Sequence, residues 1–153
     1  MINDFGFISL VLSVLTSIYV LSAAWRGRDE PAGPWLASAR RAVVAVFLLL
    51  TLSTAAVVYG LVTGDFQVDY VYQTSAQAMS TFLKVTALWG GQDGSILFWT
   101  WLMAAFAAAV VVRKWDEDRV LMPWVILVSV GTLLFFQGVS LFIANPFERL
   151  WFL

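Results

Sequence analysis

Four long runs without a charged residue constrain this fold more than any other feature of the sequence. They cover residues 5–25, 42–64, 94–112 and 120–147. A helix of about 20 residues spans the ~30 Å hydrocarbon core of a bilayer, so each run is long enough to cross it. We therefore predict an all-α integral membrane fold, a single transmembrane region over residues 1–153. Its four transmembrane helices are expected at about 5–25, 42–62, 95–112 and 122–144.

The composition agrees with a membrane protein that carries little chemistry of its own. Of 153 residues, 61% are apolar and 12% are charged, about half the charge of a soluble domain. The net charge of -1 and the few scattered basic residues exclude nucleic acid as a partner. The chain has no cysteine and no histidine, which removes thiolate chemistry and the commonest metal and haem ligand. We predict no catalytic residue and no metal site.

The basic residues predict how the helices are oriented. The first connection between the runs carries Arg26, Arg28, Arg40 and Arg41, and the third carries Arg113, Lys114 and Arg119. The middle connection carries one basic residue, Lys84. Short basic connections remain in the cytoplasm. Both termini and a long loop at residues 65–94, between helices two and three, are therefore predicted to be extracytoplasmic, an N-out/C-out arrangement.

The long loop ends in a break before the third helix. Residues 70–72 predict a short extended or interfacial stretch, and residues 76–88 predict an amphipathic helix on the membrane surface. The glycine pair at 90–91 interrupts this helix. Asp93 and Ser95 supply side-chain oxygens for the first amides of the third helix, so we predict that they cap it.

The most informative stretch is KVTALWGGQDGSILFW, residues 84–99. Tryptophans, glycines, a carboxylate, an amide and a lysine converge there beside an apolar run. Flat aromatic faces and open backbone at a bilayer surface suit a large planar ligand or a partner polypeptide. The candidate site residues are Lys84, Trp89, Gly90, Gly91, Gln92, Asp93, Gly94, Ser95 and Trp99.

Each of these residues also has a purely structural interpretation. Trp89 and Trp99 match the aromatic belt at a membrane interface, as do Trp25, Trp35, Trp115 and Trp124. Lys84 is typical of a lysine that reaches from the interface into water. The glycine pair is typical of an ordinary helix break, and Asp93 is typical of a helix cap.

Three further features concern packing and charge. Gln137, in the middle of the last run, is expected to bond another helix. Small residues at Ala104, Ala108, Gly131 and Gly138 predict faces where helices approach closely. The acidic residues 116–118 resemble a metal cluster, but basic neighbours in a short connection favour a solvated charge run.

The motif WGGQDGSILFW at residues 89–99 resembles the signature W-G-G-x-x-G-S-x-x-x-W near the N-terminus of the CcmF family. These proteins are the system I haem lyases of cytochrome c maturation, with the related nitrite-reductase assembly proteins. Sequence similar to that of the family also occurs at Tyr70-Val71, Thr74-Ser75, residues 82–85 and residues 145–147, so the resemblance covers essentially the whole chain. Asp93 stands where the family more often has glutamate.

The resemblance implies the N-terminal quarter of such a protein, from a split gene or a longer chain. Family members are several times longer and hold haem with histidines that this chain lacks. Haem is therefore expected only with the missing remainder or a histidine-bearing partner subunit, and none bound by this chain alone. The implied role is an extracytoplasmic platform where haem vinyl groups join apocytochrome c thiols, in the cytoplasmic (inner) membrane. Implied partners are further CcmF-like helices, other cytochrome c maturation proteins, apocytochrome c and the lipid bilayer.

Two other functions fit the residues alone. The chain is also compatible with a non-catalytic accessory subunit of a respiratory or photosynthetic membrane complex, which copurification would reveal. An ion-conducting or transport element fits less well, because the runs hold no charged residue to mark a pathway.

Overall fold

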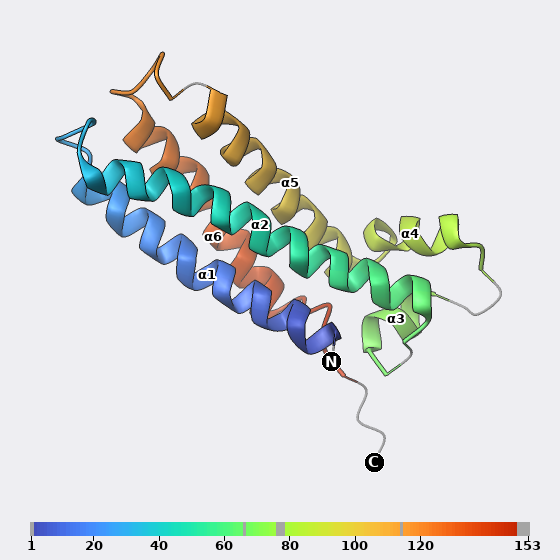
Figure 1. The fold of residues 1–153 in the computed structure, drawn as a ribbon. Coiled ribbons are helices and arrows are strands. Elements are labelled where there is room, and N and C mark those ends of the chain that lie inside the picture. Colours follow the sequence, from blue (N-terminus) through green and yellow to red (C-terminus); the bar gives the residue numbers. More distant parts are fainter. Residues whose placement is uncertain (1, 66, 76–78, 114, 150–153) are drawn as a thin grey trace.

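Four long helices pack side by side in the computed structural model, which describes residues 2–65, 67–75, 79–113 and 115–149 (Figure 1). They are α1 (Ile2–Arg26), α2 (Pro34–Thr63), α5 (Gln92–Arg113) and α6 (Met122–Phe142). All four are long and apolar enough to cross a membrane. This confirms the predicted all-α class and its four candidate transmembrane helices.

Helix α2 is longer than the charge-free run that predicted it. It begins at Pro34, where a missing amide hydrogen costs no hydrogen bond, and it carries Arg40 and Arg41 in its second and third turns. It ends at Gly64, whose left-handed backbone (φ 69°) lets its amide reach the Gly60 carbonyl. A charge-free run marks only the part of a helix that lies in hydrocarbon, so it underestimates a helix that continues into the interface.

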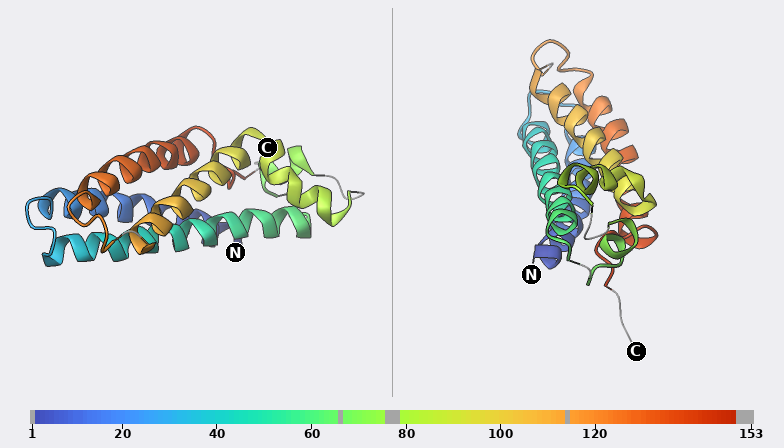
Figure 2. Two further views of the ribbon diagram at one scale, coloured as in Figure 1. Left: turned by 90° about the horizontal axis from the view of Figure 1, so that it is seen from above. Right: turned by 90° about the vertical axis from the view of Figure 1, so that its right-hand side faces the viewer.

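The four helices form a ring in which each packs against two others. Helix α1 contacts α2 and α6, and α5 contacts the same two helices from the other side. Figure 2 shows all four running along the long axis of the molecule. The core between them is built from small and branched apolar residues, among them Leu10, Val46, Leu50, Leu97 and Leu133. Lipid tails are as apolar as this core, so close packing rather than the hydrophobic effect holds it together.

A buried hydrogen bond links α6 to α1. Gln137 is fully buried, and its Nε2 donates to Ser13 Oγ at 2.9 Å. Ser13 in turn donates to the Leu10 carbonyl within α1. The predicted interhelical bond of Gln137 is therefore confirmed.

The small residues behave in two ways. Ala104 and Ala108 are buried in the bundle, as expected for faces that approach closely. A Cβ atom added at Gly131 or Gly138 would meet nothing within 4 Å. Within the described part of the chain no atom occupies the space beside these two glycines, so the prediction that a helix can approach closely there stays a prediction.

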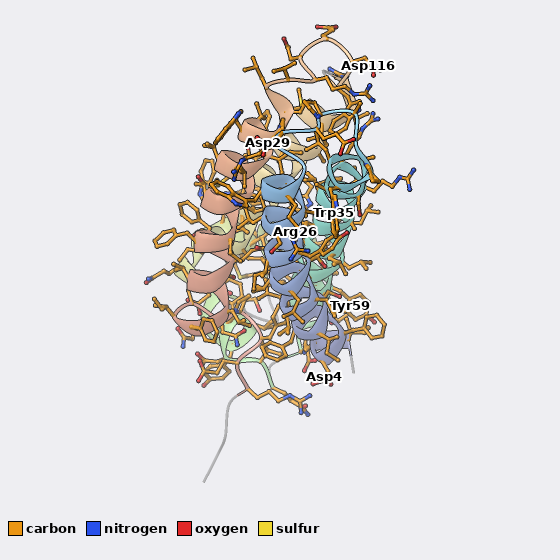
Figure 3. The ribbon with its side chains drawn as sticks, turned by 90° about the vertical axis from the view of Figure 1, so that its left-hand side faces the viewer. Asp4, Arg26, Asp29, Trp35, Tyr59 and Asp116 are labelled. Atoms are coloured by element: carbon orange, nitrogen blue, oxygen red, sulfur yellow. The ribbon has the colours of Figure 1, made fainter. Side chains whose placement is uncertain are left out.

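The two ends of the bundle differ in character. The α1–α2 and α5–α6 connections lie together at one end, and α3 (Asp69–Thr74) and α4 (Thr81–Gly90) lie at the other with the start of α1 (Figure 1). Figure 3 shows Arg26 and Asp116 towards the first end and Asp4 towards the second. Residues 116–118 are exposed, and no metal-binding group of acidic residues occurs in the described ranges.

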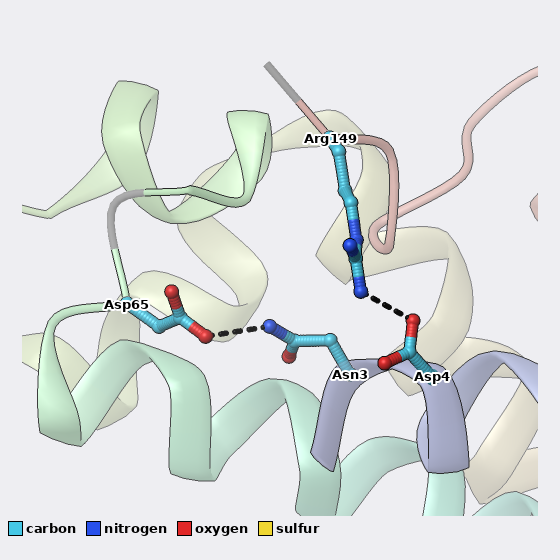
Figure 4. Close-up of polar contacts among 4 residues, drawn as sticks. All are labelled: Asn3, Asp4, Asp65 and Arg149. Atoms are coloured by element: carbon cyan, nitrogen blue, oxygen red, sulfur yellow. Dashed lines mark hydrogen bonds and ion pairs between the residues drawn. The ribbon is translucent and has the colours of Figure 1, made fainter. Parts of the chain in front are cut away.

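Polar contacts fasten the second end (Figure 4). Asn3 Nδ2 donates to Asp65 Oδ2 at 2.8 Å, which ties the start of α1 to the chain leaving α2. Arg149 forms an ion pair with Asp4. The amide of Asp69 donates to the Glu148 carbonyl at 2.9 Å. The segment after α6 and the entry to α3 are thereby held against α1.

Candidate functional site

Helices α4 and α5 meet at a sharp corner with one residue between them. Helix α4 ends at Gly90, Gly91 has extended backbone, and α5 begins at Gln92. The Ser80 hydroxyl accepts from the Leu83 amide at the start of α4. This helix covers the end of the stretch where the amphipathic helix was predicted, and residues 76–78 lie outside the described ranges.

Tyr70 fills the inside of this corner. It is 4% exposed, and its hydroxyl donates to the carbonyls of Ala87 and Leu88 at 2.7 and 3.0 Å. These carbonyls belong to the last turn of α4, which has no helical partner for them. Burial raises the pKa of Tyr70 to about 12, so the phenol stays a neutral donor.

Residues 70–72 belong to the short helix α3, so the extended alternative predicted for them is wrong, whereas their interfacial position stays a prediction. Tyr70 and Val71 are both buried although they are adjacent, which an alternating strand could not achieve. The hydroxyls of Thr74 and Ser75 donate to carbonyls four residues earlier and help to close this single turn.

Tyr70 also explains two of the three glycines in the motif. A Cβ atom at Gly94 would lie 2.1 Å from Tyr70 Oη and 2.4 Å from the Leu88 carbonyl oxygen. One at Gly91 would lie 2.6 Å from Tyr70 Cε2 and 2.8 Å from Thr74 Cγ2. One at Gly90 would meet nothing within 4 Å. The close approach at Gly91 and Gly94 is therefore made by the protein itself, and only Gly90 offers open backbone.

A series of ring contacts runs from α4 across α5 to α2. The Trp89 and Phe98 ring centroids are 5.8 Å apart, those of Phe98 and Trp101 5.9 Å, and those of Trp101 and Phe47 6.2 Å. Phe98 also meets Trp99 edge to face at 6.2 Å. We call these five residues the aromatic ladder. Such pairs add about 0.5–1.5 kcal/mol each beyond their buried area.

The outer members of the ladder present aromatic surface. Trp89 is 52% and Trp99 57% exposed, and Phe82 at the start of α4 is 75% exposed. Lys84 is half-buried on the same helix and has no ion pair with any described residue. The structure thus links both predicted tryptophans through Phe98 and places Lys84 on the same helix as Trp89.

The prediction that Asp93 and Ser95 cap α5 is wrong. Both residues lie inside the helix, because α5 already begins at Gln92. The Ser95 hydroxyl donates to the Gln92 carbonyl at 2.9 Å, within its own helix. Asp93 is half-buried, and its carboxylate is repelled by the negative charges of Asp69 and Glu148. Gln92 is exposed, so its amide faces outward.

Sequence reasoning missed three residues that build the site, Tyr70, Phe98 and Trp101. Phe98 and Trp101 are three positions apart on one helix, a spacing that could have placed them on one face. Trp101 Nε1 donates to Thr51 Oγ1 of α2 at 2.9 Å, which fixes the inner end of the ladder. The role of Tyr70 depends on contacts with residues 17 to 24 positions further along the chain, so no local sequence pattern predicts it.

The chain offers neither imidazole nor thiolate, and Tyr70 occupies the interior of the corner. What the corner offers is an exposed aromatic wall on a rigid support. Fold and site together define a multi-pass membrane segment that presents aromatic surface at one end.

Comparison with known proteins identifies the relatives of this segment. No protein-family model matches the sequence. The cytochrome c-type biogenesis protein CcmF of Haemophilus influenzae is 31% identical over 153 residues, covering 97% of this chain and 23% of that protein. The biogenesis protein ccl1 of Rhodobacter capsulatus is 32% identical, covering 98% and 23%. CcmF of Escherichia coli is 33% identical, covering 93% and 21%.

A solved structure of the cytochrome c haem lyase CcmF agrees over 99% of this chain and 25% of its own, with a TM-score of 0.89 and 27% identity. The chain belongs to the CcmF family of cytochrome c-type biogenesis proteins, of which it matches the N-terminal part. It spans about a quarter of the length of these relatives. Its four apolar helices and this relationship indicate a multi-pass protein of the inner membrane.

Proposed function

We propose that this chain is the N-terminal membrane segment of a CcmF-like haem lyase, and that its α4–α5 corner helps to form the platform for haem attachment to apocytochrome c. The observation that carries the proposal is the pair Trp89 and Trp99, both about half exposed on a corner that Tyr70 locks from inside. An exposed aromatic pair on a fixed support suits a flat ring or an extended polypeptide.

The role of this chain is positioning rather than covalent chemistry. Histidine and cysteine, which commonly ligate haem iron, are absent from this chain. Haem ligation would come from the remainder of the protein or from a second, histidine-bearing subunit. Apocytochrome c and other maturation proteins would meet the platform there. Holding two reactants in register is itself a large contribution to rate.

The orientation belongs to the same proposal. Both basic connections lie at the end opposite the corner (Figure 1), which supports an extracytoplasmic corner with both termini on that side. Because the chain is free of cysteine, a single cysteine in place of Gln92 reports its side directly. A membrane-impermeant maleimide should label the Gln92→Cys variant in intact spheroplasts and leave Asp29→Cys unlabelled. The opposite labelling pattern would exclude the platform.

The platform itself is tested by removing its aromatic wall. In a strain whose only copy carries Trp89→Ala and Trp99→Ala, covalently attached haem in c-type cytochromes should fall about fivefold or more at unchanged protein level, because two stacking contacts of ~0.5–1.5 kcal/mol are lost. Trp124→Ala is the matched control, since Trp124 is also 52% exposed and begins α6 at the opposite end. Normal haem attachment in the double variant, or an equal loss in the control, would refute the proposal.

A further inference from the structure

The end of the bundle that holds the α1–α2 and α5–α6 connections contains a cavity of about 370 Å³, between α2 and the α5–α6 connection. Its lining combines three arginines with apolar side chains: Ala37, Arg40, Arg41, Val44, Trp115 and Arg119. This cavity lies at the opposite end of the molecule from the aromatic ladder and has no part in the proposed platform.

Arg40 lines the cavity, and hydrogen bonds hold its side chain in place. Its Nε donates to the Val111 carbonyl at 3.0 Å and its Nη2 to the Val112 carbonyl at 3.4 Å. It thereby satisfies carbonyls in the last turn of α5 and places a positive charge at the negative end of that helix. Its guanidinium also lies 4.8 Å above the Trp115 ring. Trp115 is only 3% exposed, so its predicted place in the aromatic belt is wrong.

Arg41 and Arg119 are the available cations of the cavity. Both are exposed, and neither forms an ion pair or hydrogen bond with any residue in the described ranges. They approach the cavity from different elements, Arg41 from α2 and Arg119 from the connection after α5. Two guanidinium groups converging on one space match the oxygens of a phosphate, which accepts from several donors at once.

The apolar part of the lining favours a lipid over a free anion. Ala37 and Val44 line the same cavity from α2, so a ligand there meets hydrocarbon beside the guanidinium groups. Val44 lies one turn further into the membrane-spanning helix than Arg40 and Arg41. A basic pocket at the end of transmembrane helices is where an anionic headgroup is recognised.

We propose that this cavity binds the headgroup phosphate of an anionic phospholipid. Arg41 and Arg119 hold the phosphate oxygens, Arg40 adds its fixed charge, and Val44 and Ala37 contact the glycerol and the first acyl carbons. The bound lipid bridges α2 and the α5–α6 connection, and so fastens this end of the bundle to the bilayer surface.

The test uses the whole protein, as its cell makes it, delipidated in detergent and titrated with dioleoylphosphatidylglycerol under native mass spectrometry. Arg41→Gln with Arg119→Gln should weaken the first binding step roughly thirtyfold, since each basic residue near a headgroup contributes ~1 kcal/mol. The matched control is Arg26→Gln with Arg113→Gln, which removes the same charge from the same end but outside the cavity. It should change the affinity less than about threefold.

Two further measurements separate the possible ligands. Val44→Trp keeps every charge but fills the cavity, so it should also displace the lipid. Dioleoylphosphatidylcholine and millimolar inorganic phosphate should neither bind tightly nor compete. Phosphatidylglycerol binding that survives Arg41→Gln with Arg119→Gln, or Val44→Trp, would overturn the proposal. An equal loss in the control variant, or displacement by free phosphate, would overturn it as well.

Discussion

Replacing Gly94 by alanine should open the corner between α4 and α5. The added Cβ atom would lie 2.1 Å from Tyr70 Oη, 2.5 Å from Tyr70 Cζ and 2.4 Å from the Leu88 carbonyl oxygen. The last of these contacts is with backbone, so no change of side-chain rotamer relieves it. The clash with the Leu88 carbonyl therefore forces the two helices apart, and the clash with Tyr70 displaces its ring.

The expected cost follows from these contacts. Inserting a methyl group into a closed site costs ~1–3 kcal/mol. Displacing the ring also breaks the hydrogen bonds from Tyr70 to Ala87 and Leu88, a net contribution of about 1 kcal/mol. Together these give about 3 kcal/mol for opening the corner, or amide exchange about a hundredfold faster there.

Hydrogen–deuterium exchange in nanodiscs measures this directly. In Gly94→Ala, peptides covering residues 84–96 should lose protection, whereas those from α1 should not. Gly91→Ala should be milder, because its close contacts are with side-chain atoms of Tyr70 and Thr74. Gly90→Ala is the control, since nothing lies within 4 Å of its added atom. Parent-like protection in Gly94→Ala, or equal loss in Gly90→Ala, would refute the assigned role of Tyr70.

Three other contacts give predictions of their own. Because the pKa of Tyr70 is raised to about 12 from 10.0, its contribution to stability should be complete below pH 10 and disappear as the pH rises towards 12. The difference between the alkaline absorbance titrations of the parent protein and of Tyr70→Phe should show one phenol that ionises well above pH 10. A difference that titrates near pH 10 would contradict the prediction. Gln137→Leu and Ser13→Ala should couple by about 1 kcal/mol in a double-mutant cycle of detergent unfolding, and a coupling of zero would remove the proposed interhelical bond from the energetics. Asp4→Asn should speed tryptic cleavage after Arg149 only modestly, since their ion pair is half exposed and therefore weakened by solvent. High salt should cancel that difference, whereas a difference insensitive to salt would point to another cause.

The fold was predictable because hydrocarbon imposes a simple rule on sequence. A run without charge long enough to span is a helix in almost any context. The ends of the helices were less predictable, since Arg40 lies within α2 and finds carbonyl and aromatic partners on the α5–α6 side. These partners are about 70 positions away in sequence, so only the packed bundle supplies them.

The site was predictable in part. The glycine pair and the tryptophans identified the corner, because breaks and interfacial aromatics have local signals. The reason for Gly94 was out of reach, since it is the Tyr70 ring from another helix. Asp93 and Ser95 were misread as caps, because the preceding helix continues to Gly90 and α5 begins at the next residue but one.

The corner joins local rigidity to the proposed function. A surface that binds a flat ring gains affinity when its own side chains are already ordered, because less conformational entropy is lost on binding. Trp89 lies on the last turn of α4 and Trp99 on α5, so their relative position depends on the angle that Tyr70 fixes. Under the proposed function this chain contributes position rather than ligands, so a loosened corner should impair haem attachment even with both tryptophans present. Gly94→Ala should therefore reproduce much of the defect of the double tryptophan variant, whereas Gly90→Ala should not.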